Sequence, residues 1–225
     1  MRTTDRSLLM DIFHRLLSHY GQQHWWPSDS PFEVIIGAIL TQSASWRNVE
    51  KAIDNLKTMK VLDPISLLRL PHSTLAELIR PSIYFNTKAN KIKAFCTYLR
   101  DHHNLNLNHL LKQDSGTLRK ELLSIHGIGY ETADAIILYA AHQAIFVVDN
   151  YTSRISNRMG LTEANISYTS LQEFFMLNLE TNLYLFNEYH ALLDEHGAVT
   201  CKKTTPNCQD CCLLNLCHTG IRYTS

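Results

Sequence analysis

The chain has 225 residues, enough for one large domain or two small ones, and its hydrophobic content of 45% is ample for a packed core. Its formal net charge is zero, which argues against a partner held by bulk charge alone, such as a nucleic acid. No stretch approaches the roughly 20 apolar residues of a membrane span. The N-terminal segment, interrupted by Asp5 and Asp11, reads as an amphipathic helix and not as a signal peptide. We therefore expect no membrane partner and a cytoplasmic protein, whose thiols stay reduced.

The spacing of apolar residues predicts helices along almost the whole chain. Apolar residues recur at intervals of three and four from Leu8 to Leu16, from Val34 to Ile39 and from Val49 to Leu56. The same period continues over residues 65–70, 74–80, 86–101, 105–113, 117–124, 131–142, 151–158, 168–179 and 184–195. Short breaks with proline, glycine or serine separate these segments. Only the segment 145–148 reads as extended, so we expect an all-α protein.

Helix caps and charge add detail to this pattern. Ser30 and Thr117 stand where helix caps are expected. Residues 161–197 contain six acidic residues and no lysine or arginine, so the rest of the neutral chain carries a net charge of +6. Arg154 and Arg158 lie one helical turn apart within that remainder. The distribution fits one basic and one acidic face, and it fits ordinary solvated charge equally well.

A glycine-bearing turn connects two predicted helices in the middle of the chain. The segment 126–129, with Gly127 and Gly129, lies between a helix that ends near Ser124 and one that starts about Tyr130. Glycine permits backbone conformations closed to other residues, and the N–H groups of such a turn and helix start suit a phosphate. A helix connection without any ligand would show the same pattern.

Four cysteines near the C-terminus have the composition of a metal centre. Cys201, Cys208, Cys211 and Cys217 form the pattern C-x6-C-x2-C-x5-C, with a further cysteine, Cys212, beside the third. Thiolate is a soft ligand, so the candidates are zinc and an iron–sulfur cluster. The spacing is asymmetric, unlike the paired C-x2-C knuckles usual for zinc.

Several motifs in the same order resemble the DNA glycosylase superfamily that includes endonuclease III. The pattern L-x-x-I-x-G-I-G-x-x-T-A at residues 122–133 resembles its helix-hairpin-helix, and the apolar run that ends at Asp149 resembles the run that leads to an aspartate at a helix start. The segment around Gln42 resembles one whose glutamine enters the gap left by an extruded base. The segment 83–89, with Lys88, resembles another shared segment near the DNA.

This resemblance implies an all-α, two-lobed helix-hairpin-helix DNA glycosylase fold with a C-terminal [4Fe–4S] cluster loop. One lobe would span residues 22–132, the second would join residues 1–21 to residues 133–200, and the loop would cover residues 201–217. It implies a monomeric base-excision-repair enzyme of bacterial or archaeal type, used at the nucleoid on double-stranded DNA with a damaged base. The cluster ligands would be the four cysteines of the pattern, and the DNA contacts Gln42, Lys88, Gly127, Gly129, Thr132 and Arg154.

The resemblance implies a catalytic role for Asp149, and the sequence departs from the bifunctional members at residue 131. Asp149 would stabilise the positive charge that develops on the sugar as the N-glycosidic bond breaks, or orient a water, and capping the next helix is its structural alternative. Bifunctional members carry a lysine directly before the Thr-Ala of the hairpin, where it forms a Schiff base. Here that residue is Glu131, and Lys120 lies eleven residues upstream. We therefore expect a monofunctional glycosylase that leaves an abasic site.

The three tryptophans suggest a base pocket. Trp25, Trp26 and Trp46 flank the Gln42 segment, and aromatic stacking holds extruded bases. The runs around them resemble the endonuclease III-like 3-methyladenine glycosylases, although those enzymes lack the cluster. We expect the tryptophans and Glu131 to hold an alkylated purine, whose positive charge is attracted to π faces. Packing between helices is the alternative for Trp25 and Trp26.

Two other functions stay open from the sequence. The enzyme could instead remove an oxidised pyrimidine or a mispaired base, with weak AP-lyase activity. The chain could also be a non-catalytic DNA-binding module on the same scaffold. The presence of both Asp149 and Gln42 argues against the non-catalytic module.

Overall fold

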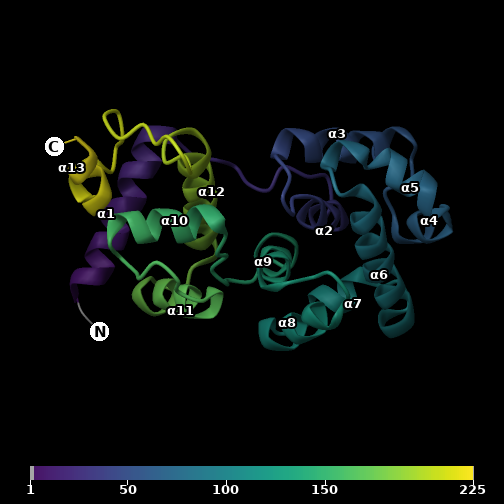
Figure 1. Ribbon diagram of the computed structural model, residues 1–225. Helices are drawn as coiled ribbons and strands as arrows, with labels where there is room; N and C mark the ends of the chain where they lie inside the picture. Colours follow the sequence, from purple (N-terminus) through teal and green to yellow (C-terminus); the bar gives the residue numbers. More distant parts are fainter. Residues whose placement is uncertain (1–2, 225) are drawn as a thin grey trace. The chain divides into compact units, whose positions relative to one another are not determined.

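The computed structural model describes residues 3–224, and every regular element in that range is a helix (Figure 1). The chain folds into two compact units. The central unit runs from Trp26 to Gln143, and the terminal unit joins the chain up to Trp25 to the segment from Ala144 onward. No helix among the described residues is both long and apolar enough to cross a membrane.

The central unit is built around one helix that is buried on all sides. Its helices are α2 (Pro31–Leu40), α3 (Trp46–Thr58), α4 (Pro64–Arg69), α5 (His72–Leu78), η1 (Arg80–Ser82), α6 (Phe85–His103), α7 (Leu107–Leu111), α8 (Ser115–Ser124), α9 (Tyr130–Ala135) and the π-helical turn η2 (Ile136–Ala140). Every residue of α2 after Pro31 is buried, which explains its nearly unbroken apolar sequence. Helices α3, α6, α9 and η2 pack against it.

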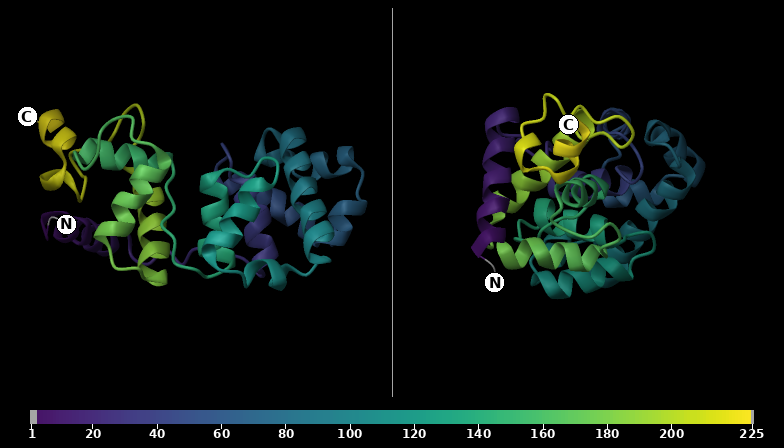
Figure 2. Two further views of the ribbon diagram at one scale, coloured as in Figure 1. Left: turned by 90° about the horizontal axis from the view of Figure 1, so that it is seen from below. Right: turned by 60° about the vertical axis from the view of Figure 1, so that its left-hand side comes forward.

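The terminal unit brings the two ends of the chain together. It contains α1 (Thr3–Tyr20), α10 (Asn150–Met159), α11 (Tyr168–Asn178), α12 (Leu183–Val199), η3 (Leu214–Leu216) and α13 (His218–Thr224). Helix α12 packs against both α1 and α10, and α13 packs against α10 (Figure 2). Phe146 and Phe175 stack with ring centroids 4.2 Å apart, and the Tyr189 hydroxyl donates to the Leu9 carbonyl at 2.8 Å.

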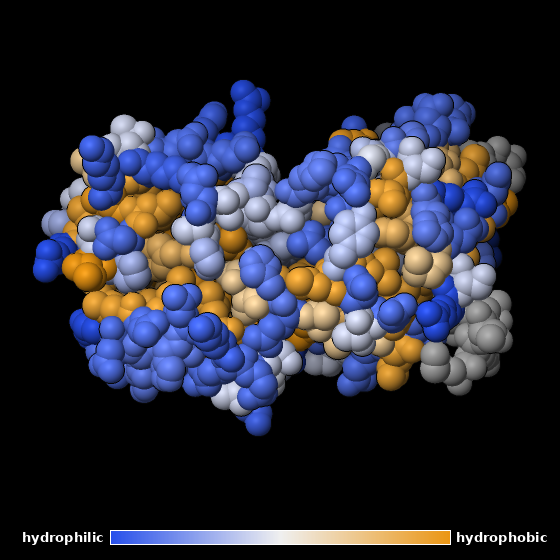
Figure 3. All heavy atoms as spheres, turned by 180° about the vertical axis from the view of Figure 1, so that it is seen from behind, coloured by the Kyte–Doolittle hydropathy of each residue, from blue (hydrophilic) through white to orange (hydrophobic). Residues whose placement is uncertain are grey.

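Hydrophilic and apolar side chains are interspersed on the face of the molecule seen in Figure 3. Large apolar side chains exposed in the described residues include Met59 in the central unit and Leu177 in the terminal unit. Isolated exposed apolar side chains of this kind are normal on folded proteins.

The helical pattern of the sequence is confirmed, with three differences. Helix α8 begins before Thr117, because the carboxylate of Asp114 caps it by accepting from the Thr117 N–H at 3.0 Å. The segment 145–148 belongs to no strand and is a buried connection. The compact units also differ from the expected lobes at residues 22–25 and 133–143, because α9 continues directly into η2 and both pack on α2.

Candidate functional site

The predicted hairpin is present as α8, the turn 125–129 and α9. Gly127 has a φ of +87°, and a Cβ there would lie 2.3 Å from Cγ of Lys91, so only glycine fits this position. Gly129 is extended, and a Cβ there would meet nothing within 4 Å. Ile128 is buried, as expected for a residue that pins the two helices. The turn therefore needs one of its glycines for steric reasons.

An ion pair and a polar junction hold this hairpin. The carboxylate of Asp134, which is fully buried, accepts two hydrogen bonds from Arg119 at 2.6 and 2.7 Å and so joins α9 to α8. The amide of Gln42 donates to the Gly127 carbonyl at 3.1 Å and to the Thr132 hydroxyl at 2.9 Å. Three of the predicted DNA-contacting residues are thus brought together, and the Gln42 side chain fastens α2 to the hairpin.

Lys91 completes this junction and was not predicted. Its ammonium group donates to Oε1 of Gln42, and its aliphatic stem covers Gly127. Both amide ends of Gln42 are therefore engaged within the central unit. The only sequence signal for Lys91 was its place in a short basic region with Arg80, Lys88 and Lys93, which gives no contact partner.

Lys88 does not lie where a phosphate contact requires. Its side chain is buried, and its ammonium donates to the carbonyl of Leu40 at 2.8 Å and to the carbonyl of Ser82. Burial, followed by repulsion from Lys91, lowers the pKa of Lys88 to about 8. The expectation that Lys88 binds DNA directly is therefore corrected. Its side chain joins the C-terminal end of α2 to η1, because the last carbonyls of a helix need donors.

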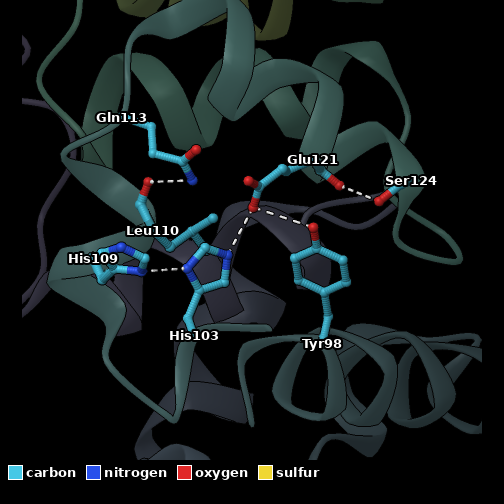
Figure 4. A network of polar contacts seen from close by, with 7 residues as sticks. All are labelled: Tyr98, His103, His109, Leu110, Gln113, Glu121 and Ser124. Carbon is cyan, nitrogen blue, oxygen red and sulfur yellow. Dashed lines mark hydrogen bonds and ion pairs between the residues drawn. The ribbon is translucent and has the colours of Figure 1, made fainter. Parts of the chain in front are cut away.

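A second polar network anchors α8 to α6 and α7 (Figure 4). Glu121 on α8 accepts from Nε2 of His103 at 2.7 Å and from the Tyr98 hydroxyl at 3.1 Å. Nδ1 of His103 faces Nδ1 of His109 at 2.9 Å. Burial would raise the pKa of Glu121, but hydrogen bonds from His103, Gln113 and Tyr98 together hold it below its ordinary value. An ionised Glu121 accepts only, so Nε2 of His103 is the donor.

Asp149 lies in the terminal unit at the start of α10. It is the N-cap residue, half-buried, and its carboxylate accepts from the Thr152 N–H at 2.6 Å. The neighbouring helix α12 carries His190, which is buried and contacts the edge of Trp25 at a centroid distance of 6.0 Å. Burial lowers the pKa of His190, although the negative charge of Asp149 opposes the shift, so a neutral imidazole lies near the carboxylate.

The three tryptophans are divided between the two units. Trp25 belongs to the terminal unit with His190, whereas Trp26 contacts Trp46 and Tyr139 in the central unit at centroid distances of 5.2 and 5.4 Å. Trp26 also lies over Gly37, where a Cβ would be 3.0 Å from Cζ2 of the indole. We call Trp26, Trp46 and Tyr139 the central aromatic cluster.

Glu131 belongs to the same unit as the central aromatic cluster. It is exposed in the first turn of α9, the helix that continues into η2 and Tyr139.

Arg154 is used inside the terminal unit. It donates to the carbonyl of Cys201 and to the carbonyl of Gly197, both at 2.9 Å, and its guanidinium lies 4.9 Å from the centroid of the Tyr151 ring. These contacts tether α10 to the C-terminal end of α12, and the expected DNA contact of Arg154 stays a prediction. Unpaired carbonyls at a helix end attract such cations.

Arg158, one turn further along α10, binds the segment 201–217, which we call the cysteine loop. It donates to the carbonyls of Lys202 and Lys203 at 2.7 and 2.8 Å, and its Nη1 lies 3.3 Å from Sγ of Cys201. The spacing of Arg154 and Arg158 marked them as a pair on one helix face, but the sequence did not show that this face meets the loop.

All four predicted metal ligands line one cavity. Ile155, Met159 and Leu213 line it with the four cysteines, whereas Cys212 is missing from its described lining. Burial raises the pKa of Cys211 to about 11, with repulsion from neighbouring cysteines adding to it. A cationic metal group would deprotonate such thiols. Among residues 3–224, no three histidine, cysteine or acidic side chains are grouped as ligands of a single metal ion.

Comparison with known proteins places these features in a family. The family model described as HhH-GPD superfamily base excision DNA repair protein matches residues 36–180. A protein of Methanocaldococcus jannaschii, provisionally named a DNA repair glycosylase, is 40% identical over 219 residues, which cover 96% of this chain and 99% of that protein.

Two solved structures are similar in fold to this chain. A trapped endonuclease III–DNA covalent intermediate has a TM-score of 0.85 and 23% identity, with 100% of both chains covered. The H. pylori 3-methyladenine DNA glycosylase bound to 1,N6-ethenoadenine has a TM-score of 0.72 and 25% identity, covering 85% of this chain and 96% of that one. The predicted fold class is confirmed.

We predict that Lys88→Met changes how stability depends on pH. The ordinary pKa of lysine, 10.5, is lowered to about 8 in the folded protein, so between these values the unfolded chain binds a proton that the folded chain does not. The free energy of unfolding of the wild type should therefore rise with pH across this window relative to the variant. A neutral amine still has two N–H donors for the two carbonyls.

Urea unfolding at several pH values within that window measures the difference. Lys51→Met, at an exposed position on α3, is the matched control and should follow the wild type. If the free energies of unfolding of the wild type and Lys88→Met changed with pH in the same way, the lowered pKa of Lys88 would be contradicted.

Proposed function

Because this chain belongs to the HhH-GPD superfamily of base excision DNA repair proteins, we propose that it is a monofunctional DNA glycosylase for alkylated purines. Membership makes it a DNA N-glycosylase, and the proposal concerns its chemistry and its base. The observation that carries the first part is Glu131, which stands directly before Thr132 and Ala133 in the hairpin. A carboxylate cannot form the Schiff base through which a lysine cleaves the strand.

Asp149 supplies the charge that the hydrolysis needs. Departure of the base develops positive charge on the sugar, and a fixed carboxylate beside it lowers the barrier. The hydrogen bond from the Thr152 N–H fixes one carboxylate oxygen at 2.6 Å. The other oxygen can orient a water for attack on C1′. The neutral His190 does not compensate the negative charge of Asp149.

The choice of base rests on aromatic side chains and on one relative. Trp26, Trp46 and Tyr139 gather in the central unit, and a π face attracts a base that carries positive charge. Glu131, in the same unit, would favour the same charge. The similarity to a 3-methyladenine DNA glycosylase, at 25% identity, agrees with this choice. An oxidised pyrimidine or a mispaired base is the alternative substrate of the same reaction.

The cysteine loop is proposed to hold a [4Fe–4S] cluster. Four-cysteine ligation is what this cluster requires, and Cys201, Cys208, Cys211 and Cys217 line one cavity. With all ligand positions taken by thiolates, the bound group contributes rigidity and a reduction potential, not a coordination site for the reacting sugar. Arg158 and apolar side chains of α10 would surround it.

Asp149→Asn should lower the rate of base release by at least about 100-fold while DNA binding stays intact, because the variant loses the negative charge. Asparagine caps helices as well as aspartate does, so α10 should keep its start. Asp63→Asn, at the N-cap of α4, is the matched control and should keep activity. If both variants lose DNA binding and thermal stability alike, Asp149 serves only as a cap.

Duplexes with one lesion each, scored for released base, test the reaction and the substrate together. We expect release of methylated purines, an intact strand at the abasic site, and no covalent adduct after borohydride reduction. Release of an oxidised pyrimidine with methylated purines untouched would contradict the substrate. A borohydride-trapped adduct that requires a lysine would contradict the monofunctional reaction.

Cysteine variants test the cluster. Cys208→Ser should lose visible absorbance and iron, whereas Cys212→Ser should keep about four irons per chain, because Cys208 lines the cavity and Cys212 is not part of its described lining. Iron content and zinc content of both purified proteins give the answer. Stoichiometric zinc in the wild type would overturn the proposal.

A further inference from the structure

The end of α1 reaches the cysteine loop through a row of three polar side chains. The hydroxyl of Tyr20 lies 2.8 Å from Oγ1 of Thr200 and 2.9 Å from Nδ1 of His196. The other ring nitrogen of His196, Nε2, lies 3.7 Å from Sγ of Cys211. His196 is 1% exposed, so its ring has no access to bulk water.

The proposed cluster, on which this inference rests, fixes the direction of every hydrogen bond in the row. A metal-bound thiolate only accepts, so Nε2 of His196 must carry the proton. In the neutral ring Nδ1 is then an acceptor, and the Tyr20 hydroxyl must donate to it. The oxygen of Tyr20 is left to accept from the Thr200 hydroxyl. The tautomer of His196 is thus set by a tyrosine that lies 176 residues away in the sequence.

From this geometry we propose that Tyr20 and His196 are positioning residues that direct an N–H group at the Cys211 sulfur and raise the reduction potential of the bound cluster. Donors to cluster sulfurs and their burial set such potentials. An N–H at 3.7 Å stabilises the more negative, reduced state. The Tyr20 hydroxyl acts through His196, since it does not itself reach a cysteine.

Other cysteines of the loop have donors of their own, so the effect belongs to one ligand. Nη1 of Arg158 lies 3.3 Å from Sγ of Cys201, and the Gly220 N–H donates to Sγ of Cys217 at 3.2 Å. Neither involves Tyr20 or His196. Removing the Tyr20 hydroxyl should therefore weaken one hydrogen bond to sulfur and leave the others in place.

Voltammetry of the iron-loaded full-length protein tests this inference. Tyr20→Phe keeps the ring but frees the tautomer of His196, and His196→Phe removes the N–H entirely. We expect both variants to have a lower potential than the wild type. For His196→Phe we expect about a tenfold lower ratio of reduced to oxidised cluster at a fixed ambient potential, which is about 59 mV for one electron. Tyr98→Phe, the same change in the central unit, should leave the potential unaltered.

Spectroscopy of the reduced protein gives a readout independent of activity. With 15N-labelled histidine, a nitrogen hyperfine coupling should be present in the wild type and absent in His196→Phe. Variants with full iron content, wild-type potentials and unchanged coupling would overturn this inference while leaving the cluster in place. A wild-type protein without iron would overturn the cluster proposal and, with it, the inference.

Discussion

The arrangement of the central unit depends on the close approach of a lysine stem to a glycine. Gly127 has no side chain, so Lys91 can cross the hairpin turn and place its ammonium on Gln42. Gln42 in turn holds the Gly127 carbonyl and Thr132. Because Gly127 lacks a Cβ, α6, the segment after α2 and the hairpin meet in a single polar junction. This junction fixes the position of the hairpin within the central unit.

Several basic side chains of this DNA-processing protein serve its interior. Lys88 and Arg154 both satisfy carbonyls near the ends of helices, and Arg158 does the same for the cysteine loop. Helix ends present unpaired carbonyls wherever helices are short and numerous, so an all-α chain has many such demands. This use of cations is consistent with a net charge of zero in a protein whose substrate is a polyanion.

The sequence predicted the features that depend on local pattern, namely the helices, the hairpin, the cap at Asp149 and the set of four cysteines. Prediction from the sequence failed for side chains whose role depends on whether they are buried. A lysine in a basic region reads the same whether it points to solvent or, like Lys88, to carbonyls of α2 and η1. Adjacent residues can also belong to different units, as Trp25 and Trp26 do. The contacts of His196 and His190 could not be predicted, because a histidine on a buried helix face shows its partners only in three dimensions.

The two units differ in how they can be assembled during synthesis. The central unit is one continuous stretch of chain, whereas the terminal unit needs α1 from the beginning and α12 from near the end. On the ribosome, domains fold as their residues emerge, so the central unit is complete while the apolar stripe of α1 still lacks α12. Tyr20 can meet His196 only after the whole central unit, which separates them in the sequence, has been made. The unit that contains Asp149 and the cysteine loop therefore closes after the central unit, because the central unit separates its two parts in the sequence.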